Sequence, residues 1–525
     1  MVDTPWQGDA VSLVEAFRSG ERSPREELDA TFAAIEASDL NAFSHLDREG
    51  AYAAIDHVDV SLPFGGVPTG IKQLDTVAGW PDTEASLVFE DRIADQTAPH
   101  VERLRTRGGA IAVGATTSSE FGGLNVSVTR LNGITHNPWR HGRTVGGSSA
   151  GSSASVAGGL LTLATASDGG GSIRIPAAYT GLFGMKGTYG RIPRGPVAFS
   201  RPSTAVLGSL TRSVRDAARF YDVCAGPHPW DPASLPSGGT WEADLGTHDL
   251  SGKRVAVVVD LGGVDLEAGV RERIDAHADA LIAAAGMRRV EVDVQLVNVT
   301  AEWMLGNMST LMAGLGPLWP RCAGLLTQSI EDGMRIAESF YNLRTAAIAE
   351  TKRVRLNRAM SDIFDQVDFV MAATNPGPAF PAEWEMSKPL PQKAERILSH
   401  RWTRVAARAA LGGVRVGGGL APRLPGAVLA AATAAVPEML EMGGLTISSN
   451  IYGNPAASIP AGLIDGLPVG LQVLAPHHHD ALLFDLALVA ERELPWPITA
   501  TVPGARAEAD RAVTMAGATT PSSRD

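Results

Sequence analysis

The sequence predicts an α/β fold. A valine-rich segment at residues 253–260 is followed by a helical pattern at 266–285 and by a second apolar segment at 290–297. This strand–helix–strand order is typical of a parallel unit in an α/β sheet. Residues 154–166 predict a buried helix followed by a short buried strand. The chain has 525 residues, 44% hydrophobic and 19% charged, and this is the composition of an ordinary globular protein.

The first segments of the chain are predicted to be helices that cover the sheet. Residues 12–17 form a helical pattern that closes at Gly20. A second helix is expected to run from the capping box Ser23-Pro24-Arg25-Glu26 to about residue 37, and a third over about 48–57.

The next segments alternate strands and helices. Residues 64–72 predict a turn and a short buried strand that ends at Lys72. A helix is expected over 97–107, with Thr97 as its cap, and a strand over 110–114. A further buried strand is expected over 368–378, and irregular loops over 381–391 and 412–425.

A glycine- and serine-rich stretch, residues 143–190, is the segment around which the rest is organised. It contains Asp168-Gly169-Gly170-Gly171-Ser172, in which consecutive glycines allow backbone N–H groups to turn toward one point. A serine hydroxyl directly after such a nest would be a nucleophile beside its own oxyanion hole.

Three separated motifs in this order resemble the amidase signature family of serine hydrolases. They are G-G-S-S-A-G-S at 146–152, D-G-G-G-S-I-R-I-P-A at 168–177 and the segments at 450–462 and 466–472. The resemblance implies a large mixed, central twisted β-sheet covered by helices on both faces. It also implies one amidase domain over 1–503, with the signature core at about 60–225, a variable substrate-facing region at about 300–425, and a disordered tail at 504–525.

The resemblance also implies a Ser-Ser-Lys triad. Ser172 matches the nucleophile, Ser148 the bridging serine with a cis peptide bond, and Lys72 the base that closes the family's G-V-P-x-x-x-K segment. The N–H groups of Gly169, Gly170, Gly171 and Ser172 would form the oxyanion hole, and Ser149, Asp168 and Arg174 would hold the loop in shape. The family usually has an acidic residue after the lysine, where this chain has Gln73.

The function implied is hydrolysis of a small-molecule carboxylic acid amide to acid and amine or ammonia through an acyl-enzyme on Ser172. Three alternatives stay open: the glutaminase subunit of a tRNA-dependent amidotransferase, a catalytically silent scaffold, and an α/β-hydrolase that uses Ser149 within G-x-S-x-G at 147–151. Methionine and tryptophan in the middle of the chain favour an apolar acyl or aryl amide as substrate. The residues do not specify an oligomeric state, although members of the family are often homodimers.

Composition argues against several other classes. The net charge is −12 without a long basic run, so neither nucleic acid nor an anionic membrane is an expected partner. The N-terminus does not resemble a signal peptide, and the apolar run at 426–436 is too short for a bilayer span, which predicts a cytoplasmic protein. No cofactor or metal is expected, because the adjacent His477, His478 and His479 diverge. Cys224 and Cys322 are expected to be buried small hydrophobes, and His136 and His141 to be loop residues.

Overall fold

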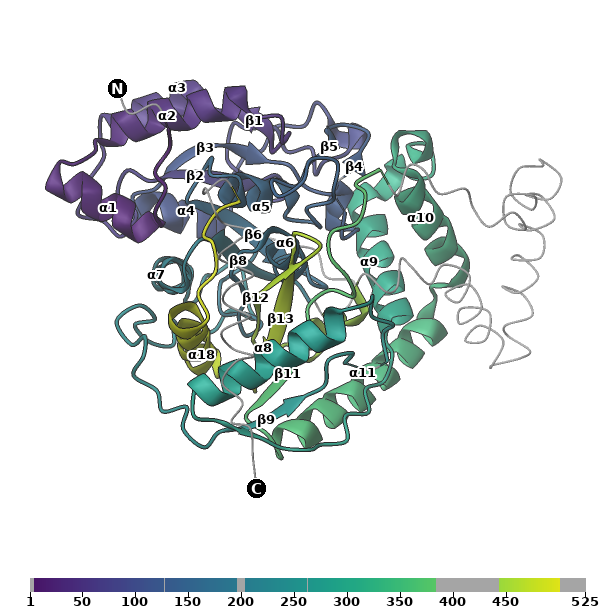
Figure 1. Cartoon of the computed structure of the whole chain (residues 1–525). Coiled ribbons are helices and arrows are strands. Elements are labelled where there is room, and N and C mark those ends of the chain that lie inside the picture. Colours follow the sequence, from purple (N-terminus) through teal and green to yellow (C-terminus); the bar gives the residue numbers. More distant parts are fainter. Residues whose placement is uncertain (1–3, 127, 196–203, 262, 384–442, 501–525) are drawn as a thin grey trace.

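The computed structural model describes residues 4–126, 128–195, 204–261, 263–383 and 443–500 (Figure 1). Two mixed sheets form its centre, with strand orders β1-β3-β2-β6-β8 and β10-β9-β11-β13-β12-β7. The strands of the first sheet are β1 Phe43–Leu46, β3 Ile111–Thr116, β2 Pro68–Lys72, β6 Leu163–Asp168 and β8 Val206–Thr211. Those of the second are β10 Arg288–Arg289, β9 Arg254–Val257, β11 Phe369–Ala373, β13 Leu467–Leu474, β12 Ala456–Ile464 and β7 Gly184–Lys186.

The two sheets are joined at their β8 and β7 edges. An isolated antiparallel bridge pairs Phe183, next to β7, with Thr211 of β8. In the first sheet β2 runs parallel to β3 and β6, whereas β1 and β8 are antiparallel to their neighbours. The predicted large mixed sheet is therefore present, as two halves connected by one bridge.

Helices cover this centre on both faces (Figure 1). They are α1 Ala10–Ser19, α2 Pro24–Ala37, α3 Arg48–Ile55, α4 Pro99–Thr106, α5 Ala150–Ala157, α6 Arg174–Thr180, α7 Val214–Cys224, α8 Val270–Ala284, α9 Thr300–Leu315, α10 Gln328–Phe340, α11 Leu343–Phe364, α17 Ile447–Tyr452 and α18 Asp480–Glu493. The three predicted N-terminal helices are confirmed, including the Ser23 capping box and the left-handed C-cap at Gly20. No helix in the described ranges is both long and apolar enough to cross a bilayer.

Two local predictions are wrong. Thr97 does not cap α4, which begins after Ala98 without a side-chain cap; its hydroxyl instead accepts a hydrogen bond from the Ala78 amide at 3.1 Å. The strand expected over 290–297 is not formed, because β10 ends at Arg289. The Val290 amide still donates to the Val255 carbonyl of β9 at 2.8 Å, whereas the apolar side chains from Val292 to Val297 are partly buried against the core without joining the ladder.

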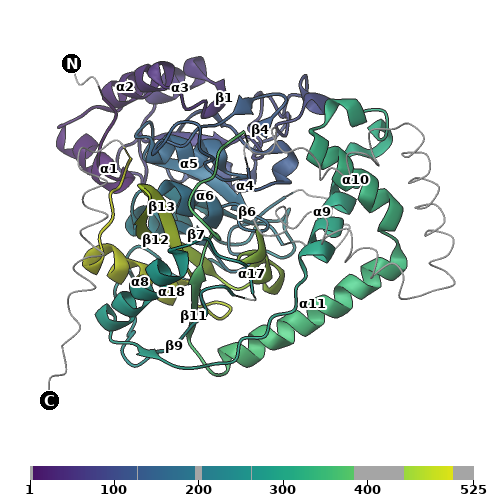
Figure 2. The same ribbon diagram turned by 45° about the vertical axis from the view of Figure 1, so that its right-hand side comes forward.

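Helices α9, α10 and α11 form a layer along one side of the molecule (Figures 1 and 2). Its apolar cluster includes Met308, Trp319, Ile330 and Met334. Glu120 attaches this layer to the first sheet, because its carboxylate accepts hydrogen bonds from the Thr327 amide and hydroxyl at 2.8 and 2.7 Å. The predicted loop at 412–425, most of that at 381–391, the apolar run at 426–436 and the tail at 504–525 lie outside the described residues.

Candidate active site

Strand β2 carries Lys72 into the interior. Every residue of this strand is buried, and the Lys72 side chain at its end is 0% exposed. The Lys72 amine donates hydrogen bonds at 2.9 Å to three hydroxyls, those of Ser148, Ser149 and Ser167. No motif in the sequence marks Ser167 as a partner of Lys72. Ser167 lies on β6, the parallel neighbour of β2, so it reaches the same edge of the sheet as Lys72.

Burial lowers the pKa of Lys72 from its ordinary value to about 7, although the carboxylates of Asp75 and Asp168 oppose the shift. An ammonium in a dry interior is penalised relative to the neutral amine. A substantial fraction of Lys72 is therefore neutral near pH 7, so its nitrogen can accept a proton from a hydroxyl that it contacts.

The acidic group near Lys72 comes from Asp75. Gln73, which stands where the family usually has an acid, is bonded to Thr83 and Asn132 at 2.8 and 2.7 Å. The buried Asp75 carboxylate accepts a hydrogen bond from Thr165 at 2.8 Å and lies 3.2 Å from His100 Nε2. A carboxylate therefore acts on Lys72 from three residues along the chain, although Gln73 stands at the adjacent position.

Ser148 is positioned by the turn that begins α5. The Gly147–Ser148 peptide bond is cis. A Cβ atom on Gly147 would lie 2.9 Å from the Val126 amide nitrogen, so the backbone passes too closely for a side chain there. The segment at 120–126 packs against this turn, and a Cβ atom built on Gly122 would lie 3.3 Å from Ser148 Oγ. The same Oγ is 2.9 Å from Lys72 Nζ.

The glycine-rich loop carries Ser172 from the end of β6 to the start of α6. Gly171 has φ +125°, a conformation that L side chains rarely adopt, and its N–H donates to Asp168 Oδ1 at 2.6 Å. Among the described residues, the N–H groups of Gly169, Gly170 and Ser172 have no hydrogen-bond acceptor. The Gly171 N–H is therefore already occupied, and the oxyanion hole stays a prediction for the other three N–H groups.

The structure joins two of the three expected triad members directly. Lys72 contacts Ser148, whereas no hydrogen bond within the described chain joins Ser148 to Ser172. Ser172 is 5% exposed and Ser148 3% exposed. The bond from Ser148 to Ser172 stays a prediction.

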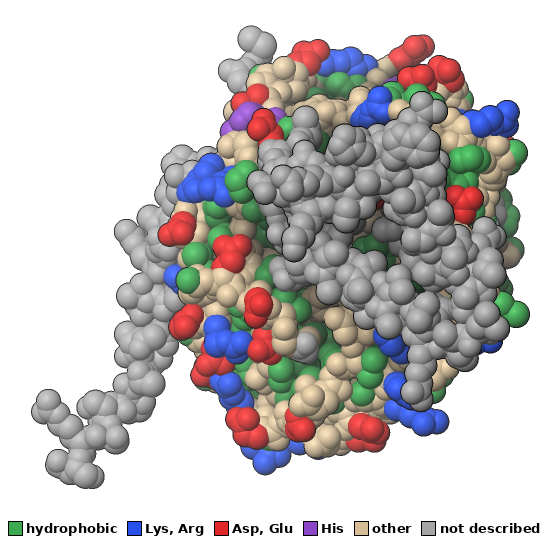
Figure 3. Space-filling view, turned by 90° about the vertical axis from the view of Figure 1, so that its right-hand side faces the viewer, with side chains coloured by type: hydrophobic (Ala, Val, Ile, Leu, Met, Phe, Trp, Pro, Cys, Tyr) green, Lys and Arg blue, Asp and Glu red, His purple; other side chains and the backbone are tan. Residues whose placement is uncertain are grey.

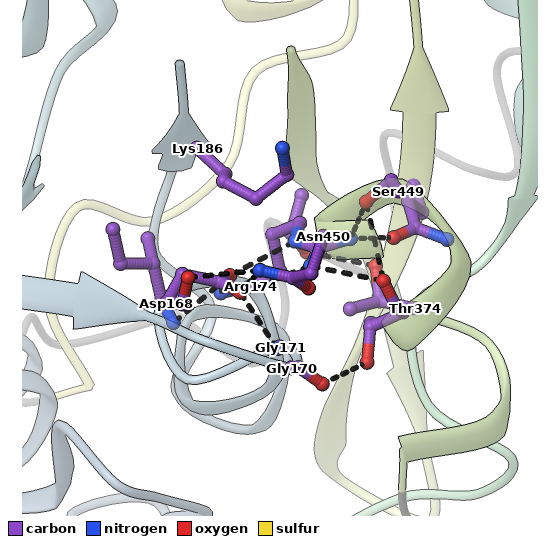
Figure 4. A network of polar contacts seen from close by, with 12 residues as sticks. Asp168, Gly170, Gly171, Arg174, Lys186, Thr374, Ser449 and Asn450 are labelled. Carbon is purple, nitrogen blue, oxygen red and sulfur yellow. Dashed lines mark hydrogen bonds and ion pairs between the residues drawn. The ribbon is translucent and has the colours of Figure 1, made fainter. Parts of the chain in front are cut away.

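Asp168 and Arg174 form a fully buried ion pair beneath the loop (Figure 4). The Arg174 guanidinium contacts both carboxylate oxygens of Asp168 at 2.9 and 3.0 Å. Burial alone would raise the pKa of Asp168, but the guanidinium holds it well below its usual range. The loop is therefore supported by an ion pair in which the Asp168 carboxyl is ionised at neutral pH.

Helix α17, the Thr446 carbonyl that precedes it and β13 supply further partners of Arg174. Its guanidinium donates to Ser449, Asn450 and Gln472 at 2.8, 2.6 and 2.5 Å. The Asn450 amide donates in turn to the Asp168 carbonyl at 2.8 Å. Asn450 and Gln472 lie in segments that carry the family resemblance, and Ser449 directly precedes one of them, but the sequence alone does not assign these residues to the loop.

Other residues singled out from the sequence lie away from this site. His136 and His141 stack on each other with ring centroids 3.8 Å apart. In the part of the chain that the structure describes, no group of His, Cys, Asp and Glu side chains could hold a metal ion. Cys224 and Cys322 are buried free thiols, as predicted.

Comparison with known proteins gives matches over almost the whole chain. The family model described as Amidase matches residues 26–415. A glutamyl-tRNA(Gln) amidotransferase subunit of Salinispora tropica is 31% identical over 529 residues, covering 92% of this chain and 96% of that protein. An acylamidase of Rhodococcus erythropolis is 31% identical over 510 residues, covering 93% and 95%.

Solved structures match the fold equally broadly. A bacterial aryl acylamidase of the amidase signature family superposes with a TM-score of 0.79 at 23% identity, covering 98% of this chain and 99% of that one. A 6-aminohexanoate cyclic dimer hydrolase superposes with a TM-score of 0.77 at 24% identity, covering 94% and 98%.

Proposed function

This chain belongs to the Amidase family and is an amidase, a hydrolase that cleaves amide C–N bonds, and we propose that it acts through Ser172, Ser148 and Lys72. Ser172 is the nucleophile, Ser148 transfers its proton and Lys72 is the base. The observation that carries this assignment is the buried Lys72 amine, with a pKa of about 7, at 2.9 Å from Ser148 Oγ.

The reaction begins with two proton transfers. Neutral Lys72 takes the proton of Ser148, and Ser148 takes that of Ser172, whose Oγ attacks the amide carbonyl. A tetrahedral intermediate forms, and its oxyanion is stabilised by the N–H groups of Gly169, Gly170 and Ser172.

The second half of the cycle returns the proton. Protonated Lys72 gives it through Ser148 to the leaving nitrogen, so that the C–N bond breaks and the amine departs. Water then attacks the acyl-enzyme with Lys72 again as base, which releases the acid and regenerates Ser172. Proton return is essential here because an amide anion is a poor leaving group.

Ser149 is assigned a positioning role. Its hydroxyl accepts from Lys72 Nζ at 2.9 Å and donates to the Ser167 carbonyl at 3.3 Å. An α/β-hydrolase nucleophile elbow requires a strand that leads into the serine. Residues 137–148 contain turns and isolated bridges instead.

The glutaminase subunit of an amidotransferase is the second candidate. The 31% identical relative from Salinispora tropica, which this chain matches over nearly its full length, is a glutamyl-tRNA(Gln) amidotransferase subunit. On the described part of the face in Figure 3, basic and acidic side chains are intermixed, so the basic side chains there do not form one continuous patch. Co-purification of partner subunits, with glutamine hydrolysis that depends on them, would favour this candidate over a free-standing amidase.

The proposed substrate is an amide with an apolar acyl or aryl group. The α9–α10 layer next to the loop is apolar, with Met308, Trp319 and Ile330 among its buried residues. A panel of amides that differ in acyl group tests this, and a strong preference for small charged amides would contradict it.

Active-serine labelling tests the triad. A fluorophosphonate probe is expected to form an adduct that mass spectrometry maps to Ser172, and that Ser172→Ala abolishes. Ser149→Ala serves as the matched control, since it removes a neighbouring hydroxyl and should leave the adduct at Ser172. An adduct on Ser149 would contradict the assignment.

A further inference from the structure

The Gly169–Gly170 peptide is held by side chains from distant parts of the chain. Trp303, near the start of α9, donates from its indole Nε1 to the Gly169 carbonyl at 2.9 Å. Thr204 donates to the same carbonyl at 3.0 Å. Thr446 donates to the next carbonyl, that of Gly170, at 2.6 Å. The carbonyl oxygens of Gly169 and Gly170 are thus both held by side chains that lie outside the loop.

The Trp303 ring also lies directly against the loop. A Cβ atom built on Gly170 would lie 2.4 Å from Cζ2 of Trp303, which is closer than real contacts allow. The indole of Trp303 therefore occupies the space that a side chain at position 170 would need. The ring and the indole N–H together fix both the distance and the orientation of this peptide.

Two donors on one carbonyl affect the other end of the same peptide. The Gly169 carbonyl and the Gly170 N–H belong to one peptide unit, so hydrogen bonds to the oxygen polarise the N–H, and such chains strengthen one another cooperatively. The Gly170 N–H has no acceptor among the described residues and is one of the three donors assigned to the oxyanion. Donors act on the transition state only when they are held in place before the reaction.

We propose that Trp303 is a positioning residue of the oxyanion hole, which orients and polarises the Gly169–Gly170 peptide from α9. This inference rests on the proposed Ser172 mechanism, and it gives the helical layer a part in catalysis. The start of α9 is itself anchored by an ion pair between Glu302 and Lys352 of α11 at 2.5 Å. The loop geometry thus depends on a helix in the region that the resemblance marks as variable and substrate-facing.

The variant Trp303→Phe keeps an aromatic ring against Gly170 and removes the N–H donor. Loss of a direct oxyanion donor costs about 10²–10³ in kcat, and a donor that acts through the peptide is expected to cost less, about 10-fold. KM should stay within about two-fold, because the substrate ground state does not carry the oxyanion charge. Affinity for a trifluoromethyl ketone analogue of the best amide should fall by the same factor as kcat/KM.

Trp241→Phe is the matched control. Trp241 is buried in the core cluster away from the loop, and its indole nitrogen has no hydrogen-bond partner among the described residues. This substitution should leave kcat, KM and the analogue affinity unchanged. Equal losses in both variants would overturn the proposal, as would a Trp303→Phe enzyme with wild-type kcat and analogue affinity.

Thr204→Val provides a second test that does not disturb α9. It removes the other donor to the Gly169 carbonyl, so it should lower kcat and analogue affinity together in the same pattern. If Trp303→Phe does not fold, an unchanged kcat in Thr204→Val overturns the proposal. Failure of the underlying mechanism is distinguishable, because Ser172→Ala would then retain turnover whatever Trp303 does.

Discussion

Two lysines are fully buried in the part of the chain that the structure describes, and their amines have different partners. Lys72 and Lys186 are both 0% exposed, and burial lowers the pKa of each to about 7. The Lys72 amine contacts three serine hydroxyls. The Lys186 amine contacts backbone carbonyls, those of Asn454 and Gly187.

The difference lies in what the partners can do with a proton. A hydroxyl both donates and accepts, so a neutral Lys72 can draw a proton through Ser148. A backbone carbonyl only accepts, so Lys186 can tie β7 to the segment at Asn454 but cannot activate anything through it. A depressed pKa is therefore not a sufficient sign of catalysis; the chemistry of the neighbours decides.

The largest expected contrast is in turnover. Lys72→Met should lower kcat by about 10⁴–10⁶-fold, as removal of a triad member does in other serine hydrolases. Lys186→Met should stay within about three-fold of wild type, because no reacting atom depends on it. Steady-state kinetics on one amide measure both, with unfolding temperatures as the control for folding. Equal losses would contradict the distinction.

The Asp168–Arg174 pair acts on both lysines, since the Asp168 carboxylate raises the pKa of each. Arg174→Met leaves that carboxylate buried without its partner, and the free energy of unfolding should fall by about 3–5 kcal/mol. Arg254→Met removes a half-exposed ion pair with Asp368 and should cost less than about 1 kcal/mol. Urea unfolding of both variants checks the difference; similar losses would argue against a structural role for the buried pair.

Lys186 also predicts how stability changes with pH. Its pKa is about 7 in the folded chain and about 10.4 when unfolded. Between these values the unfolded state binds one more proton, so stability rises with pH by up to about 1.4 kcal/mol per unit. Lys186→Met should remove that pH dependence. The free energy of unfolding of Lys186→Met should therefore exceed that of wild type by more at pH 7 than at pH 10. An unchanged slope in denaturant titrations would show that Lys186 is not neutralised on folding.

Asp75 should affect only one of the two lysines. Its carboxylate raises the pKa of Lys72 and is not among the charges that act on Lys186. Asp75→Asn should therefore move the acidic limb of kcat/KM to lower pH. Gln73→Glu, which adds a carboxylate beside Lys72, should move the limb the other way. Shifts of the same sign in both variants would contradict this electrostatic account.

Short motifs make the proposed reacting residues of this protein recognisable in the sequence. Lys72, Ser148 and Ser172 each stand in a local pattern whose chemistry is recognisable without a structure. Their supports are different: Arg174 reaches Gln472, and Trp303 reaches Gly169, across long sequence separations. Such pairs are created by packing, and no local pattern marks them.

The errors have the same origin. The alternation over 290–297 is the signature of a half-buried strand, yet beyond Val290 the segment is partly buried against the core without a ladder partner. Periodicity reports which side chains are buried and does not report hydrogen bonding. Asp75 is not marked by the motif either, because the family's usual acidic position directly follows the lysine and is occupied here by Gln73.

The most direct test of the two-lysine account is the pH dependence of fluorophosphonate labelling at Ser172 in wild type, Lys72→Met and Lys186→Met. The wild-type rate should rise through an apparent pKa near 7. In Lys186→Met the labelling rate should show the same rise with pH. In Lys72→Met labelling should be slow, and its rate should not rise through a pKa near 7. A limb that persists in Lys72→Met, or that disappears in Lys186→Met, would contradict the assignment of Lys72 as the base.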